Sequence, residues 1–124
     1  ADSANGRLVI AEELETDSHL KVYTLDGRFT GQTFGRGRFP QQAEGIALYS
    51  CDGDAGYWIA TDQGPAVNTF HVFDRQSFRH LASFAGAKTN TTDGVALTQR
   101  GFGPFPGGAF YMAHADGAIS ALSW

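Results

Sequence analysis

AEGIAL at residues 43–48 and TDGVAL at residues 92–97 are two copies of one short pattern. Each copy places an acidic residue and a glycine just before a run of residues that favour β-strands. The two acids, Glu44 and Asp93, stand 49 residues apart. The repeat therefore predicts two strands that each begin with an acid, and a site that the two acids share.

Similar short segments, rich in β-branched and aromatic residues and separated by turn residues, fill the rest of the chain. The sequence has sixteen glycines, ten phenylalanines and four prolines, and no window keeps a helical period long enough to require a helix. We therefore predict an all-β protein, with a hairpin at Asp26–Gly27. The expected strands are 7–13, 20–25, 29–34, 43–50, 56–62, 69–74, 81–84, 93–97, 109–113 and 118–124.

The segments repeat with a period near 50 residues. Ile10-Ala11 lies 49 residues before Ile59-Ala60, and Met112-Ala113 lies 53 residues after that pair. About 50 residues and four strands per unit are typical of a β-propeller blade. We expect a single partial propeller domain over residues 1–124, with a partial blade at 1–42, a full blade at 43–91 and a partial blade at 92–124.

The innermost strand of each blade begins near the central channel, so Glu44 and Asp93 are expected to converge there. Glu13 and Gln63, which follow equivalent strands, are expected at the same rim, and His114 is expected at the blade position of Gln63. All four converging side chains offer oxygen ligands, which suit calcium rather than zinc. The alternative is that they cap strands or bind exposed backbone amides.

Composition excludes several classes of function. The formal net charge of −4 and the scattered basic residues argue against nucleic acid as a partner. No apolar run is long enough for a membrane helix, and no signal-peptide pattern opens the chain, although a cleaved secreted protein has the same appearance. Histidine spacing for zinc and a G-x-S-x-G nucleophile motif are absent.

Propellers close with about four to eight blades, which is more than this chain provides. We therefore expect either a fragment of a longer protein or an assembly of several chains. The remaining blades, whether from the same protein or from other chains, are therefore an expected partner of this chain.

Several motifs together resemble the C-terminal part of the β-propeller phytases. They are EGIALY at 44–49, GYWIATDQG at 56–64, VFDR at 72–75 and TDG at 92–94, with AEE at 11–13 and FPGG at 105–108 in the same register. The resemblance covers nearly the whole chain, and the combination is more specific than any single motif.

The resemblance implies a six-bladed, secreted or periplasmic phosphomonoesterase that needs Ca²⁺ and releases phosphate from phytate (inositol hexakisphosphate) or another phosphorylated small molecule. By motif, it implies that Glu13, Glu44, Gln63 and Asp93 are calcium ligands, and that Glu44 and Asp93 position a metal-bound water. Three departures stand out: Gln42 replaces a frequent acidic ligand, AHADG at 113–117 replaces a Gln-Asp-Gly run, and the blades that carry basic phosphate ligands are absent.

Three hypotheses follow. The chain supplies part of a calcium-dependent phytate-hydrolysing site, or it is a non-catalytic, calcium-stabilised binding or scaffold module, or identical chains assemble into a complete ring.

Overall fold

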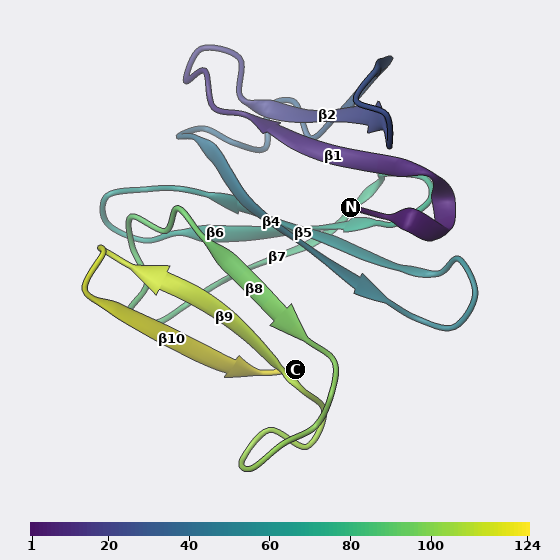
Figure 1. Cartoon of the computed structure of the whole chain (residues 1–124). Coiled ribbons are helices and arrows are strands. Elements are labelled where there is room, and N and C mark those ends of the chain that lie inside the picture. Colours follow the sequence, from purple (N-terminus) through teal and green to yellow (C-terminus); the bar gives the residue numbers. More distant parts are fainter.

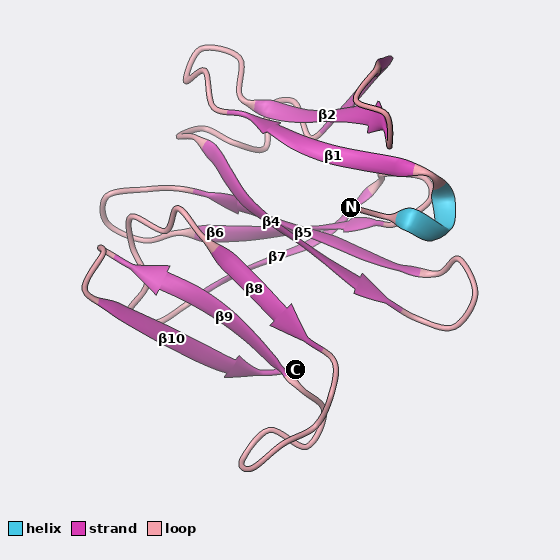
Figure 2. Cartoon of the chain, viewed as in Figure 1, coloured by secondary structure: helices cyan, strands magenta, loops and turns pink.

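The computed structural model describes all 124 residues, and its regular secondary structure is almost entirely β-strand (Figure 2). The exception is one 3₁₀ turn at Ser3–Asn5. The strands are β1 (Arg7–Glu12), β2 (His19–Thr24), β3 (Phe29–Phe34), β4 (Ala43–Ser50), β5 (Gly56–Asp62), β6 (Thr69–Asp74), β7 (His80–Ala85), β8 (Val95–Thr98), β9 (Ala109–His114) and β10 (Ala118–Ser123). The predicted all-β class is confirmed.

The ten strands form three antiparallel sheets that follow one another like propeller blades (Figure 1). The first sheet is β1-β2-β3, the middle sheet is β4-β5-β6-β7, and the third sheet is β8-β9-β10. β4 contacts both β1 and β8, so the middle sheet lies between the other two. The proposed blade boundaries at 42/43 and 91/92 stay a prediction.

The strand positions agree closely with the sequence pattern, and β2 pairs with β3 across Asp26–Gly27 as the hairpin signal predicts. One difference concerns the two acid-led copies. Glu44 lies inside β4, whereas Asp93 and Gly94 precede β8, which begins at Val95. The pairing of β8 with β9 begins at Val95, which lies opposite Met112. Asp93 therefore belongs to the loop that leads into the strand.

The strand registers show which residues are equivalent in the three sheets. The registers match β1 with β5 and β9, and β2 with β6 and β10. Val9, Ile59 and Tyr111 then occupy the same position, as do Leu20, Phe70 and Ile119. In this register His114 is equivalent to Asp62, so the expected match of His114 with Gln63 is wrong by one residue. The β4–β5 and β8–β9 connections differ in length, which short sequence matches do not detect.

Two apolar clusters hold the sheets together. The cluster between the first and middle sheets contains nine buried residues, including Trp58 and Phe73, and Phe34 stacks on Phe78 with ring centroids 4.4 Å apart. The cluster between the middle and third sheets contains five, in which Phe110 packs edge-on against Phe70. Because the interfaces differ in size, the third sheet is the more weakly held.

A buried ion pair joins the N-terminal segment to the middle sheet. Arg75 donates to both carboxylate oxygens of Asp2, at 2.6 and 3.1 Å, and Arg7 donates to Asp2 Oδ2 at 3.2 Å. Arg75 also donates to the carbonyl of Ala55 in the β4–β5 turn. No helix in the structure has the length and apolar character needed to cross a membrane.

Candidate functional site

A β-bulge in β4 shapes the candidate site. Ala43 pairs with Asp62 and Ile46 pairs with Ala60, so β4 has one more residue than β5 across Glu44 and Gly45. A bulge changes the direction in which side chains point and is common beside functional sites. The bulge therefore sets the direction of the Glu44 side chain.

Gly45 allows the loop before β8 to lie directly against this bulge. A Cβ atom at Gly45 would lie 2.9 Å from the Val95 backbone nitrogen and 3.0 Å from the Asp93 carbonyl oxygen. Only a residue without a side chain permits this approach. The glycine in the AEGIAL pattern thus explains how Asp93 comes close to Glu44.

The four residues singled out by the sequence lie in one region. Glu13 follows β1 and Gln63 follows β5, while Asp93 precedes β8. The Gln63 side chain donates a hydrogen bond from Nε2 to Asp93 Oδ1. Burial raises the pKa of Glu44, and the negative charges of Glu13 and Asp93 raise it further.

These side chains fit a hard cation in their chemistry. Three carboxylates and one carboxamide offer only oxygen ligands. Burial raises the pKa of Glu44 most, and the repulsion from Glu13 and Asp93 that adds to it is of the kind that a divalent cation relieves. They do not form a preformed cage, since no three His, Cys, Asp or Glu side chains lie at metal-binding distance from one another. Calcium binding at this place would therefore require side-chain movement or additional ligands.

Asp62, which sequence reasoning does not single out, organises the backbone beside these residues. Its Oδ1 accepts hydrogen bonds from the backbone N–H groups of Gln41, at 3.0 Å, and Gln42, at 3.2 Å. Burial raises its pKa, and these two hydrogen bonds oppose the rise. Asp62 thus fixes the segment that leads into β4. Its only sequence signal is its position next to Gln63.

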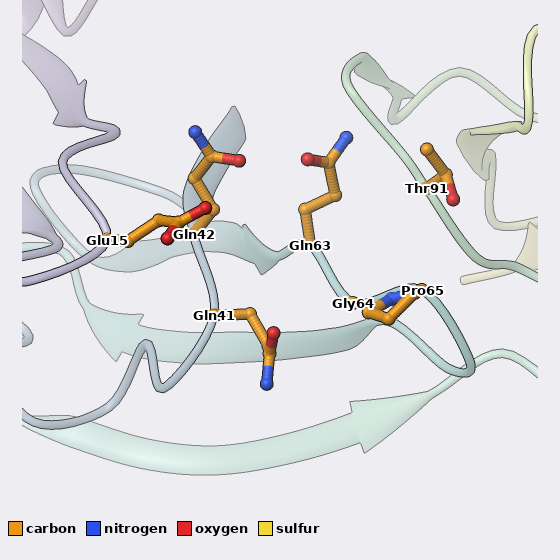
Figure 3. Close-up of a pocket in the computed structure, with 7 residues that line it drawn as sticks. All are labelled: Glu15, Gln41, Gln42, Gln63, Gly64, Pro65 and Thr91. Carbon is orange, nitrogen blue, oxygen red and sulfur yellow. The ribbon is translucent and has the colours of Figure 1, made fainter.

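A polar pocket of about 300 Å³ adjoins the site (Figure 3). The carboxamides of Gln42 and Gln63 extend to the same side, whereas that of Gln41 points the other way. Carboxamides both donate and accept hydrogen bonds, so the pocket suits hydroxyl or phosphoryl oxygens. No lysine or arginine belongs to its lining, which consists of Glu15, Gln41, Gln42, Gln63, Gly64, Pro65 and Thr91.

A buried network supports the far side of the pocket. Asn68 Oδ1 accepts a hydrogen bond from the Gly64 N–H at 2.9 Å, and Asn68 Nδ2 donates to Thr92 Oγ1. Thr92 Oγ1 donates in turn to the carbonyl of Ala113, at 2.6 Å. The network links the loop after Gln63 to the residue before Asp93. Asn68 and the pocket loops carry no periodic pattern, which is why sequence reasoning misses them. Thr92 belongs to the TDGVAL copy, but nothing in that pattern indicates its hydrogen bond with Asn68.

His114 does not join the four residues. Its Nδ1 lies 3.4 Å from the backbone N–H of Asn90, from which it accepts a hydrogen bond, and Asp116 lies in an exposed turn with φ of 54°. The AHADG segment at 113–117, which replaces the Gln-Asp-Gly run, therefore lies outside the group of four residues.

A family model described as Phytase matches residues 1–119, which is nearly the whole chain. No curated protein matches the chain in a search of such proteins. The chain therefore belongs to the phytase family, a family of phosphate-releasing hydrolases.

Proposed function

We propose that this chain supplies part of a calcium-dependent site that hydrolyses the phosphomonoesters of phytate. Membership of the phytase family supports hydrolysis of phytate in general. The observations that carry the proposal further are the charges of Glu13 and Asp93, which add to burial in raising the pKa of Glu44, and the hydrogen bond from Gln63 to Asp93.

In this proposal Glu13, Glu44, Gln63 and Asp93 hold the cation through their side-chain oxygens. Calcium, when bound, supplies positive charge to phosphoryl oxygens and makes a coordinated water more acidic. Glu44 and Asp93 would orient the attacking water when calcium is bound; besides burial, the negative charge of Asp93 raises the pKa of Glu44, so the two carboxylates interact electrostatically. Asp62 and Asn68 hold the surrounding loops, so the geometry does not depend on exposed side chains alone.

The charge of the chain limits what it does alone. The net charge is −4 and no basic residue lines the adjoining pocket, so a highly anionic substrate is repelled unless cations neutralise the site. We propose that basic phosphate ligands come from further propeller blades of a six-bladed ring. A secreted or periplasmic location, where calcium is plentiful, fits this dependence.

Phosphate release from phytate, measured with calcium and with a chelator, tests the proposal. We expect release that depends on calcium and that falls at least tenfold in Asp93→Asn, which keeps the shape but removes a charge. Asp52→Asn is the matched control, because Asp52 is exposed in the β4–β5 turn, away from the cluster. Release that is unaffected by the chelator, or equal in the two variants, would contradict the proposal.

A second candidate is a non-catalytic binding module stabilised by calcium. The observation that favours it is the absence of any lysine or arginine in the pocket lining, because phosphate transfer requires charge stabilisation. Calcium binding measured by calorimetry, together with no phosphate release under any calcium concentration, would support this candidate. Measurable turnover would exclude it.

A further inference from the structure

Two histidines and one serine converge on the outer part of the middle sheet. His71 lies in β6, and His80 and Ser83 lie in β7. His71 Nδ1 lies 2.8 Å from Ser83 Oγ, and His80 Nε2 lies 2.9 Å from the same oxygen atom. One nitrogen of each imidazole ring is therefore directed at a single point, and β5 separates these strands from β4, which carries Glu44.

A β-bulge in β7 creates this arrangement. His71 pairs with Ser83 and Phe73 pairs with His80, so β7 has one more residue than β6 between the two pairs. In a regular strand, side chains three residues apart point to opposite faces. The extra residue brings His80 and Ser83 to the same face, because a bulge redirects side chains. The spacing of the histidines in the sequence therefore does not reveal the pair.

The Ser83 hydroxyl has one proton for two ring nitrogens. If it donates to one nitrogen, the other nitrogen must carry its own proton and donate to the oxygen. A cation at this point would instead accept a lone pair from both nitrogens. Two imidazoles bound to one tetrahedral Zn²⁺ hold their ring centroids roughly 5 Å apart, since each Zn–N distance is about 2.0–2.1 Å. The centroids of His71 and His80 are 5.5 Å apart, so the rings are already spaced for a shared cation.

Aromatic side chains hold both rings in place. His71 packs edge-on against Phe39, with ring centroids 5.2 Å apart, and His80 packs edge-on against Phe73, with ring centroids 5.4 Å apart. Burial lowers the pKa of His71 to about 4, so its ring is neutral at pH 7, which is the state in which imidazole binds metals. Ser83 is exposed, so ions and water reach the point that the two nitrogens share.

Arg38 is the charged side chain that opposes a cation at this point. Burial is the main cause of the lowered pKa of His71 and His80, and the positive charge of Arg38 adds to it. The Arg38 side chain is exposed and forms no salt bridge. It is therefore free to turn towards solvent when a cation binds.

We propose that His71, His80 and Ser83 bind one divalent transition-metal ion, Zn²⁺, with water completing its coordination. Two imidazole nitrogens favour such an ion over calcium, which prefers oxygen ligands. All three ligands belong to one sheet, and the ion would link β7, at the edge of that sheet, to β6. The site shares no residue with the acidic group, so it does not depend on the proposed function.

Calorimetric titration of the chain with Zn²⁺, in excess calcium, tests the proposal. We expect Zn²⁺ binding that is at least tenfold weaker in His80→Gln, which keeps a polar side chain but removes a ring nitrogen. His114→Gln is the matched control, because His114 lies in β9 of the third sheet and bonds the backbone of Asn90. Because Zn²⁺ binds the folded chain, it should also raise the thermal unfolding midpoint of His114→Gln more than that of His80→Gln.

A gain of affinity provides a second test, under reducing conditions. Ser83→Cys replaces one oxygen by sulfur at an exposed position and adds a thiolate, which is a strong ligand of Zn²⁺. We expect Zn²⁺ to bind this variant at least tenfold more tightly than the unsubstituted chain. Ser123→Cys is the matched control, since it adds the same thiol at an exposed position of β10 in the third sheet. Circular dichroism checks that each variant is folded.

Three results would overturn the proposal. The first is an unsubstituted chain that binds no Zn²⁺. The second is equal Zn²⁺ affinity in His80→Gln and His114→Gln, which would place the ion elsewhere, for example among the acidic residues. The third is an equal effect of Ser83→Cys and Ser123→Cys, which would mean that the ion does not lie between the two rings. Zn²⁺ binding that depends on His80 in a chain without calcium binding would contradict the proposed function and uphold this inference.

Discussion

Asp2 is a buried carboxylate that two arginines hold beneath the β4–β5 turn. The Arg75 guanidinium lowers the pKa of Asp2 to about 2 from its usual 3.8. A lowered pKa stabilises the fold at pH values above 3.8, and this contribution is lost as the pH falls from 3.8 towards 2.

Asp2→Asn should therefore destabilise the protein at neutral pH. Loss of one partner leaves the Arg75 charge buried without compensation, which costs about 3 kcal/mol. Urea unfolding at pH 7 measures the change. Asp116→Asn, in an exposed turn, serves as the control, and an equal free energy of unfolding for both variants would contradict the role of the buried pair.

His71 makes stability depend on pH in a higher range. Burial lowers the pKa of His71 to about 4 from its usual 6.5, and the nearby His80 lowers it further. The ring packs edge-on against Phe39, and its Nδ1 lies 2.8 Å from Ser83 Oγ. Because the folded state favours the neutral ring, its stabilising contribution is complete above pH 6.5 and declines as the pH falls towards 4.

We predict that unfolding at pH 5 requires about 2 kcal/mol less than at pH 7 on account of His71. His71→Phe keeps an aromatic ring beside Phe39 and Phe73 but removes the titration, so it should flatten this dependence. Urea midpoints at the two pH values measure the effect. A pH dependence as steep in His71→Phe as in the unsubstituted chain would show that other groups cause it.

The bulge in β4 is the element that connects the sheet to the candidate site. The bulge contains Glu44, and its glycine, Gly45, leaves room for the backbone around Asp93 to pack closely against it. A methyl group at Gly45 would meet backbone atoms that have little freedom to move.

Gly45→Ala should cost about 1–3 kcal/mol in unfolding free energy and weaken calcium binding, since it moves Asp93 away from Glu44. Gly94→Ala is the matched control, because no atom lies within 4 Å of the added carbon. Denaturant unfolding and a calcium titration of both variants provide the comparison. Equal effects of the two substitutions would contradict a special close approach at Gly45.

The whole molecule is an unequal stack of three sheets. Nine buried residues join the first and middle sheets, and five join the middle and third sheets. Regions with fewer buried contacts open at lower free energy than the rest.

Amide hydrogen exchange should therefore be faster in β8–β10 than in β4–β7. Phe110→Ala, which removes a 0% exposed ring from the smaller cluster, should cost about 3–5 kcal/mol and speed exchange in β8–β10 first. Mass spectrometry of exchanged peptides locates the effect. Uniform acceleration over all three sheets would mean that they unfold as one cooperative unit.

The fold is largely predictable from sequence because its signals are local. Alternating apolar residues and the Asp26–Gly27 turn define strands and a hairpin within a few residues of one another. The equivalence of His114 with Asp62 is not predictable in this way, since it depends on the length of the β8–β9 connection. Nor is the docking of Asp2 on Arg75, residues 73 positions apart in the chain.

The candidate site is predictable only in part. The repeat predicts that Glu44 and Asp93 share a site, and this stays a prediction; besides burial, the negative charge of Asp93 raises the pKa of Glu44. Asp62 and the carboxamide pocket depend on loops that meet only after the sheets have packed. No short pattern marks such loops.

A calcium titration by calorimetry tests the central claim, that the converging acidic residues bind calcium. We predict measurable calcium binding by the unsubstituted chain and by Asp52→Asn, and affinity at least tenfold weaker in Glu44→Gln, which keeps the size of the side chain but removes its charge. Equal calcium affinity in Glu44→Gln and Asp52→Asn, or no calcium binding by the unsubstituted chain, would contradict the claim.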